Sequence, residues 1–284
     1  MAGHVRVTMP QRWASAAKEY EAWLKFRDLS PQSIELRMSH LKRFANATEC
    51  GPYEATTGDV MVYLSANPWS KATLSSQRAS LAVYFKWAVQ AGKMHADPLL
   101  HIPRVKVPLG KPKPVTEEDF AAALSTADQR TRLALRLAGE LGMRRGEVAK
   151  VHESDLIADP DGHLLKIIGK GNKERVIPVP ASLADELAAH IKTYGRNGWC
   201  FPSTEKPHGP LSAHWIGHLI SKALPDGYTM HKLRHRALTQ VYERTHDIVL
   251  TAGVAGHSSV NTTQAYYVAP NYSRMREALE GISG

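Results

Sequence analysis

Four short segments in the second half of this 284-residue chain carry side chains that could do chemistry together. They are GMRRGE at 142–147, GKGNKER at 169–175, HKLRH at 231–235 and GHSSVNTTQAYY at 256–267. Arginine presents a permanently charged planar fork that matches phosphate, histidine titrates near neutral pH, and a tyrosine hydroxyl is a latent nucleophile. These residue types suit an anionic substrate such as a phosphate ester.

Each segment also has an explanation that involves no chemistry. Arg144 could pair with Glu147 on a helix surface, and residues 169–172 could be a plain hairpin turn. His231, Arg234 and His235 share one helix face and could form a solvated basic stripe. His257 after a glycine could be a helix cap. Taken singly, each segment favours the structural explanation, whereas their order and separations together favour a shared site.

A zinc site built from histidines is a further alternative. His231, His235 and His257 could in principle ligate a metal. No Asp, Glu or Cys stands at the usual companion spacing, and arginines stand among the histidines, where their charge repels a cation. We therefore expect no metal.

The four segments, in this order and spacing, resemble the tyrosine recombinase (phage integrase) family. The H-x-L-R-H string at 231–235 and the nine-residue separation of His257 from Tyr266 carry the likeness most specifically, and it extends over the whole chain. The resemblance implies cleavage and rejoining of DNA through a 3′-phosphotyrosine intermediate, with no metal or nucleotide cofactor.

The resemblance also implies a role for each cation. Arg144 and Arg234 would clamp the non-bridging phosphate oxygens, and His257 would donate a third hydrogen bond to them. His231 would assist proton transfer at the nucleophile. Glu147 would orient the site without touching DNA.

The nucleophile and the general acid each have a rival. Lys170 would protonate the leaving 5′ oxygen, and Lys173 of the same turn competes for that role. Tyr266 would attack the phosphate, with Tyr267 as the nearby alternative. Adjacent residues on a helix point about 100° apart, so only one can face the phosphate, and the separation from His257 selects Tyr266. Two residues, Arg236 and Ala255, depart from the family pattern; they bear on local helix packing and remove no catalytic group.

The sequence pattern predicts the helices and strands that must position these groups. Together they make a mainly α fold with a small antiparallel sheet (α+β). Apolar spacing of three and four predicts a four-helix, SAM-like core-binding domain at 1–98, with helices over 13–29, 31–44, 57–64 and 70–91. The catalytic domain at 115–284 should contain strands over 156–158, 164–168 and 175–179. Its helices are expected to begin at 116, 132, 146, 182, 212, 231, 248, 261 and 273.

A basic, proline-rich linker at 99–114 should join the domains. Four cations in it could lie along a phosphate backbone, although an ordinary solvated linker explains them equally well: Arg104, Lys106, Lys111 and Lys113. The net charge of +9 is uneven, because residues 1–112 hold 15 Lys and Arg against 8 Asp and Glu. The excess favours nucleic acid as a partner, with a solvated basic face as the alternative.

The composition limits the setting of the protein. Two cysteines exclude a disulfide scaffold, no apolar run approaches the length of a membrane span, and residues 1–13 carry no signal-peptide core. We expect a cytoplasmic protein that acts on DNA in a bacterial or phage-infected cell. The first helix is expected to begin near residue 11, so we expect no separate arm-binding domain before it and an enzyme of the short type.

The resemblance further implies that the partner is double-stranded DNA that carries attachment or core sites. A monomer in solution would assemble as a homotetramer that synapses two sites and exchanges strands through a Holliday junction. Residues 271–284 resemble the helix that docks on a neighbouring protomer, with a frayed tail as the alternative. We expect phage integration and excision, with a possible accessory directionality factor. Xer-type dimer resolution, a non-catalytic DNA-binding regulator and a type IB topoisomerase are the alternatives.

Overall fold

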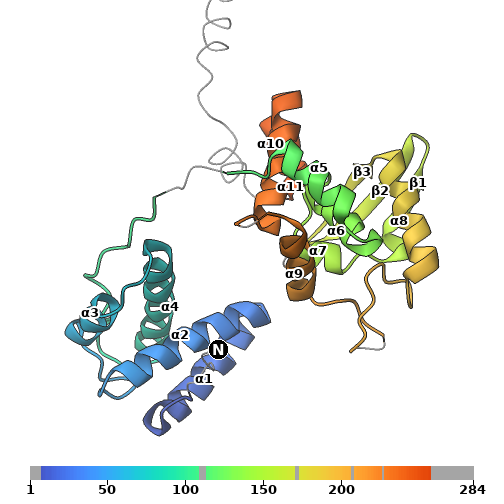
Figure 1. The fold of residues 1–284 in the computed structure, drawn as a ribbon. Coiled ribbons are helices and arrows are strands. Elements are labelled where there is room, and N and C mark those ends of the chain that lie inside the picture. Colours follow the sequence, from blue (N-terminus) through green and yellow to red (C-terminus); the bar gives the residue numbers. More distant parts are fainter. Residues whose placement is uncertain (1–7, 109–112, 170–172, 206–207, 226, 257–284) are drawn as a thin grey trace, which may run out of the picture. The chain divides into compact units, whose positions relative to one another are not determined.

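The computed structural model describes residues 8–108, 113–169, 173–205, 208–225 and 227–256. The chain divides into two compact units, 1–110 and 111–284. Within the described residues the fold is mainly helical with one small antiparallel sheet, as the sequence predicts (Figure 1).

Residues 8–108 of the first unit form four α-helices. A 3-10 turn, η1 (Gln11–Trp13), leads into α1 (Ala14–Phe26), which is followed by α2 (Pro31–Ala47), α3 (Thr57–Ser65) and α4 (Lys71–Gln90). Ser30 and Ser70 cap α2 and α4 by accepting a hydrogen bond from the amide three residues later. The cap of α3 is Thr56, one residue before the predicted start, because it forms a reciprocal capping box with Asp59.

An aromatic cluster forms the core of this unit. Trp13, Tyr20 and Phe44 are fully buried and meet Tyr84 and Phe85 of α4. The Trp13 and Phe44 rings are 5.8 Å apart, edge to face, and Tyr20 meets Tyr84 in the same way at 5.1 Å. The core extends into the predicted linker, since Leu99 is buried and Ile102 packs against it.

The second unit contains the remaining elements. It begins with α5 (Glu117–Thr126), α6 (Gln129–Gly139), α7 (Arg145–Ala149) and the 3-10 turn η2 (Glu153–Asp155). The sheet follows as β1 (Leu156–Asp159), β2 (Gly162–Ile168) and β3 (Glu174–Val179). Up to residue 256, where the described part ends, the chain then forms α8 (Ala181–Tyr194), α9 (Ala213–Ala223), α10 (Met230–Thr245) and α11 (Ile248–Ala255). The helices predicted to begin at 261 and 273 lie outside the described residues.

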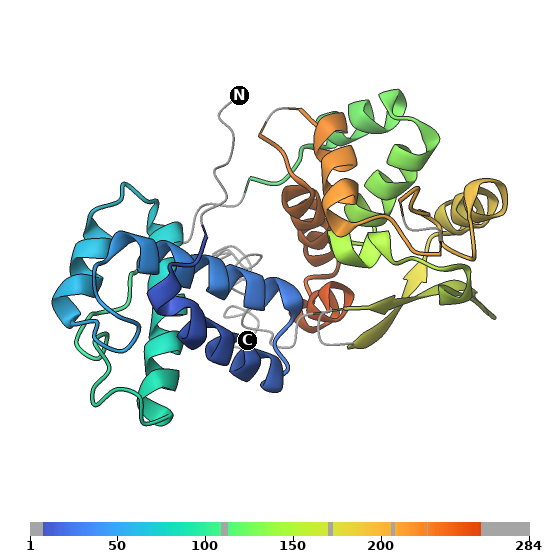
Figure 2. The same ribbon diagram turned by 90° about the horizontal axis from the view of Figure 1, so that it is seen from below.

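The sheet has the order β1-β2-β3 (Figure 1), and both pairs are antiparallel. Figure 2 shows the sheet of the second unit from below. Alternate residues of β2 and β3 face the core: Leu165 and Ile167 are buried opposite Ile177 and Arg175. Helices α6, α7, α8 and α9 contribute to the same core. The β2–β3 hairpin therefore has a fixed base, and the predicted Lys170 lies between these two strands in the sequence, outside the described residues.

Candidate active site

Arg144 is placed by the turn between α6 and α7. Gly142 has a φ of +64°, and a Cβ there would lie 3.2 Å from Leu238 Cδ2, so this position requires glycine. Arg144 then caps α7. Its amide donates to Glu147 Oε2 and its Nη1 to Glu147 Oε1, both at 2.8 Å.

Glu147 is the carboxylate at the centre of the site. Its side chain is 3% exposed and receives two hydrogen bonds from Arg175, at 3.0 Å to Oε1 and 2.8 Å to Oε2. Burial alone would raise the pKa of Glu147, but the hydrogen bonds from Arg175 and Arg144 outweigh it and lower the pKa to about 2. The carboxylate is therefore ionised throughout the physiological range.

Arg234 lies on α10 and is buried. Its guanidinium donates to the carbonyl of Gly142 and, at 2.6 Å, to the carbonyl of Ala255 at the end of α11. Its Nη1 is 3.9 Å from Glu147 Oε2. The structure thus brings together two arginines, Arg144 and Arg234, that are 90 positions apart in the sequence.

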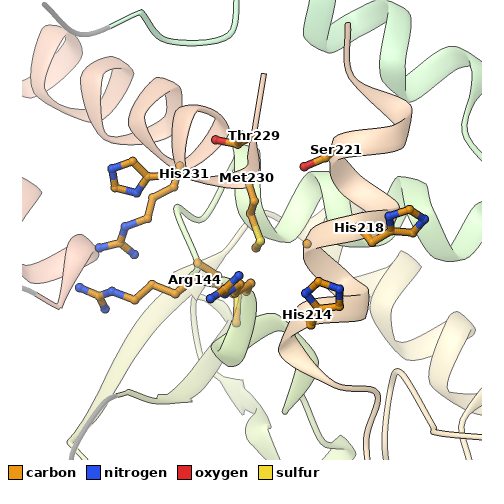
Figure 3. Close-up of a pocket in the computed structure, with 11 residues that line it drawn as sticks. Arg144, His214, His218, Ser221, Thr229, Met230 and His231 are labelled. Carbon is orange, nitrogen blue, oxygen red and sulfur yellow. The ribbon is translucent and has the colours of Figure 1, made fainter. Parts of the chain in front are cut away.

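A cavity of about 590 Å³ opens beside these groups. His231 and Arg144 lie on one side of it, and α9 lines the opposite side with His214, His218 and Ser221 (Figure 3). The remaining lining residues are Met143, Arg145, Gly217, Thr229, Met230 and Arg234. The α9 side is the part of the site that sequence reasoning missed. The spacing of His214 and His218, one helical turn apart on a predicted helix, was the available signal.

His235 does not line this cavity. Its Nδ1 is 3.1 Å from Thr239 Oγ1, and burial lowers the pKa of the imidazole. Among the described residues, no three His, Cys, Asp or Glu side chains lie close enough to hold a metal ion.

Several predicted groups lie outside the described residues: Lys111, Lys170, His257, Tyr266 and Tyr267. The residues that precede Lys170 and His257 are described. The Gly169 amide donates to the Lys173 carbonyl at 2.8 Å and closes the hairpin base, and Lys173 is exposed. Gly256, just before His257, ends α11 with a φ of +60°.

The linker cations Arg104, Lys106 and Lys113 are exposed. In the described part of the chain, no helix is both long and apolar enough to cross a membrane.

The two departures from the family pattern have structural explanations. Arg236 is buried, with its Cζ 4.0 Å above the centre of the Phe120 ring. It donates to the Gly139 carbonyl at 2.8 Å and pairs with Glu117, so it fastens α5 and α6 to α10. Ala255 is fully buried where its carbonyl meets Arg234.

Comparisons with known proteins agree with this architecture. The phage integrase family profile matches residues 114–274. Tyrosine recombinase XerC of Corynebacterium glutamicum is 30% identical over 232 residues, which cover 74% of this chain and 71% of the relative. Tyrosine recombinase XerA of Thermococcus kodakarensis is 26% identical over 258 residues, covering 88% and 89%.

Solved structures share the fold. A lambda integrase dimer bound to a COC′ core site matches with a TM-score of 0.73 and 20% identity, over 90% of this chain and 77% of that one. XerH recombinase bound to its difH substrate matches with a TM-score of 0.67 and 20% identity, over 97% and 90%. The chain therefore belongs to the phage integrase family, the tyrosine recombinases. It is an enzyme of the site-specific recombinase class.

Proposed function

We propose that this recombinase cleaves and rejoins double-stranded DNA through a covalent 3′-phosphotyrosine formed by Tyr266. The observation that carries the proposal is the convergence of Arg144 and Arg234 on one cavity, beside His231. Both arginines are tied to Glu147 or to backbone carbonyls, so their positions are set before DNA binds. Preorganised cations of this kind stabilise the charge that develops on the phosphate oxygens in the transition state.

The remaining roles are assigned by position in the sequence. A phenol has a pKa near 10, so Tyr266 needs the cationic pocket in order to attack phosphorus. As the bond from Tyr266 to phosphorus forms, the bond from phosphorus to the 5′ oxygen breaks, and Lys170 gives that oxygen its proton. His257 donates to the phosphate, and His231 assists proton transfer at the nucleophile. This chemistry needs no metal or nucleotide.

DNA would be held largely through its phosphates. The first unit and the exposed cations Arg104, Lys106 and Lys113 supply positive charge, so we expect affinity to fall steeply with salt. We further propose a homotetramer on two synapsed sites. Lambda integrase, which shares the fold, has been solved as a tetramer bound to a Holliday junction. Docking by residues 271–284 and an accessory directionality factor stay predictions.

The biological outcome has two candidates. We propose phage integration and excision, for which the fold shared with lambda integrase is the support. Xer-type resolution of chromosome or plasmid dimers is the second candidate, because the curated relatives at 26–30% identity are named XerA and XerC. Recombination of paired copies of a single site would favour Xer-type resolution, whereas a requirement for two different sites would favour integration.

The proposed chemistry can be tested before the DNA site is identified. A library of random duplexes, nicked so that cleavage traps the enzyme, is incubated with the wild-type chain and with Tyr266→Phe. Denaturant-resistant protein–DNA adducts are recovered and sequenced. The proposal predicts adducts that share a sequence for the wild type and none for the variant. Adducts from both proteins would refute Tyr266 as the nucleophile, and adducts from neither would refute the recombinase chemistry.

A further inference from the structure

Arg175 occupies a core-facing position near the start of β3. It shares the face of the strand that carries the buried Ile177 and Val179, and it pairs across the sheet with Ile167. Its side chain is only 12% exposed. A guanidinium directed toward a core must have partners that compensate for its lost hydration.

The partners of Arg175 come from two other elements. Its Nη1 and Nη2 donate to the two oxygens of Glu147 on α7, at 3.0 and 2.8 Å. Its Nε donates to the carbonyl of Val254 on α11 at 3.1 Å. All three kinds of donor nitrogen are thereby used, and the planar fork fixes α7 and α11 in one geometry.

Two glycines pack directly on this ion pair. A Cβ at Gly169 would lie 3.5 Å from Glu147 Oε1 and 3.9 Å from Arg175 Nη1. A Cβ at Gly256 would lie 2.8 Å from Arg175 Nη1, closer than real contacts allow. These glycines immediately precede Lys170 and His257 in the sequence. Arg175 therefore stands where the segments leading to three of the proposed catalytic groups, Arg144, Lys170 and His257, meet.

We propose that Arg175 is a positioning residue that holds these three segments in register, so that Arg144, Lys170 and His257 reach the same phosphate. The proposal rests on the proposed function and extends it to a residue that would not itself touch DNA. Arg175 would position Arg144 through its ion pair with Glu147. It would position Lys170 through the base of the β2–β3 hairpin, and His257 through the end of α11. A misplacement of about 1 Å at such a site costs about 100-fold in rate.

The first experiment compares Arg175→Met with Arg136→Met. Arg136 is a matched control, because its side chain is 13% exposed and pairs with Glu140 and Glu186, which are not among the residues of the candidate site. Single-turnover adduct formation and gel-shift affinity are measured on a duplex recovered from the random library. We expect Arg175→Met to cleave about 100-fold more slowly while its affinity changes by less than about threefold. Arg136→Met should cleave at the wild-type rate once the folded fraction is matched.

The outcomes separate the proposal from its premise. No adduct from the wild type would refute the proposed function, and the role of Arg175 with it. A cleaving wild type with an equally active Arg175→Met would refute the positioning role alone. Equal loss of cleavage in Arg175→Met and Arg136→Met would show a general loss of folding, and it too would refute the role.

A conservative variant tests whether geometry or charge matters. Lysine in Arg175→Lys keeps the positive charge near Glu147 but cannot hold both carboxylate oxygens and the Val254 carbonyl at once. We expect it to recover most of the stability lost in Arg175→Met and little of the cleavage rate. Recovery of cleavage to within about threefold of the wild type would refute the requirement for the fork.

A sulfur-substituted duplex tests the route to Lys170. Sulfur replaces the bridging 5′ oxygen at the cleaved phosphate, and a thiolate leaves without needing a proton. General acid catalysis is worth about 100-fold or more, so this substrate should reduce the defect of Arg175→Met by about tenfold. An unchanged defect on the sulfur duplex would refute the link between Arg175 and the hairpin.

Discussion

Glu147→Gln tests whether the buried carboxylate stabilises the site as the structure indicates. The pKa of Glu147 falls from its ordinary value of 4.5 to about 2 in the folded chain. Each pKa unit corresponds to about 1.4 kcal/mol, so ionised Glu147 contributes about 3 kcal/mol at neutral pH. Glutamine keeps the shape but not the charge, and Arg144 and Arg175 lose their shared counterion. We therefore expect Glu147→Gln to lower the free energy of unfolding by about 3 kcal/mol at pH 6.5.

The pH dependence of this difference has a definite sign. The folded pKa lies below the unfolded one, so the stabilisation is complete above about pH 4.5 and is lost as the pH falls through about 2. The difference in unfolding free energy between wild type and Glu147→Gln should shrink by about 1.4 kcal/mol for each pH unit below about 4.5. Protonated glutamic acid and glutamine should then become equivalent.

The assay is urea unfolding at pH 6.5, 4.5 and roughly 3.5, the last about one unit below the ordinary pKa. It is read by pulsed hydrogen exchange in peptides from α6 and β3, which reports on the second unit alone. Glu117→Gln is the control, because Glu117 also pairs with an arginine but its side chain is 60% exposed. That variant should cost less than about 1 kcal/mol. Two results would refute the stabilising role of ionised Glu147. One is no loss of unfolding free energy in Glu147→Gln at pH 6.5, and the other is a loss that stays constant down to the lowest pH.

Three further predictions follow from the described contacts. Arg236→Met loses the bond to Gly139 and the cation above Phe120, so the second unit should lose about 2–4 kcal/mol of unfolding free energy; a change under about 1 would contradict this. His214→Ala with His218→Ala removes the α9 side of the cavity and should weaken gel-shift affinity for the selected duplex about tenfold, whereas unchanged binding would show that α9 does not meet DNA. Arg104→Gln with Lys106→Gln should reduce the slope of log affinity against log salt by about 2, and an equal slope would mean that the linker is merely solvated.

The sequence predicted much of the local structure, because capping and apolar spacing are local properties. Helices α2 and α4 begin at or within one residue of the predicted positions, each capped by a serine, Ser30 and Ser70. The start of α3 at Thr57 is equally local, since the Thr56 side chain accepts a hydrogen bond from the Asp59 amide and caps the helix there. The hairpin was predictable because turn residues separate two alternating strands.

The site contacts that sequence reasoning missed join residues far apart in the chain. Arg175 and Val254 are 79 positions apart, and Arg236 and Gly139 are 97 apart. Periodicity within one element carries no information about such pairs. One signal was present at Arg175: on a strand that places Ile177 and Val179 in the core, the same face carries an arginine, which requires a buried counterion.

The central claim is that Tyr266 attacks DNA in a pocket built by Arg144 and Arg234. The most direct measurement is mass spectrometry of the nucleotide-bearing peptide from the trapped adduct, with Tyr267→Phe as the matched control. We predict a phosphodiester on Tyr266 in both the wild type and Tyr267→Phe, and no adduct in Tyr266→Phe. A nucleotide found on Tyr267, or an adduct that survives Tyr266→Phe, would contradict the account.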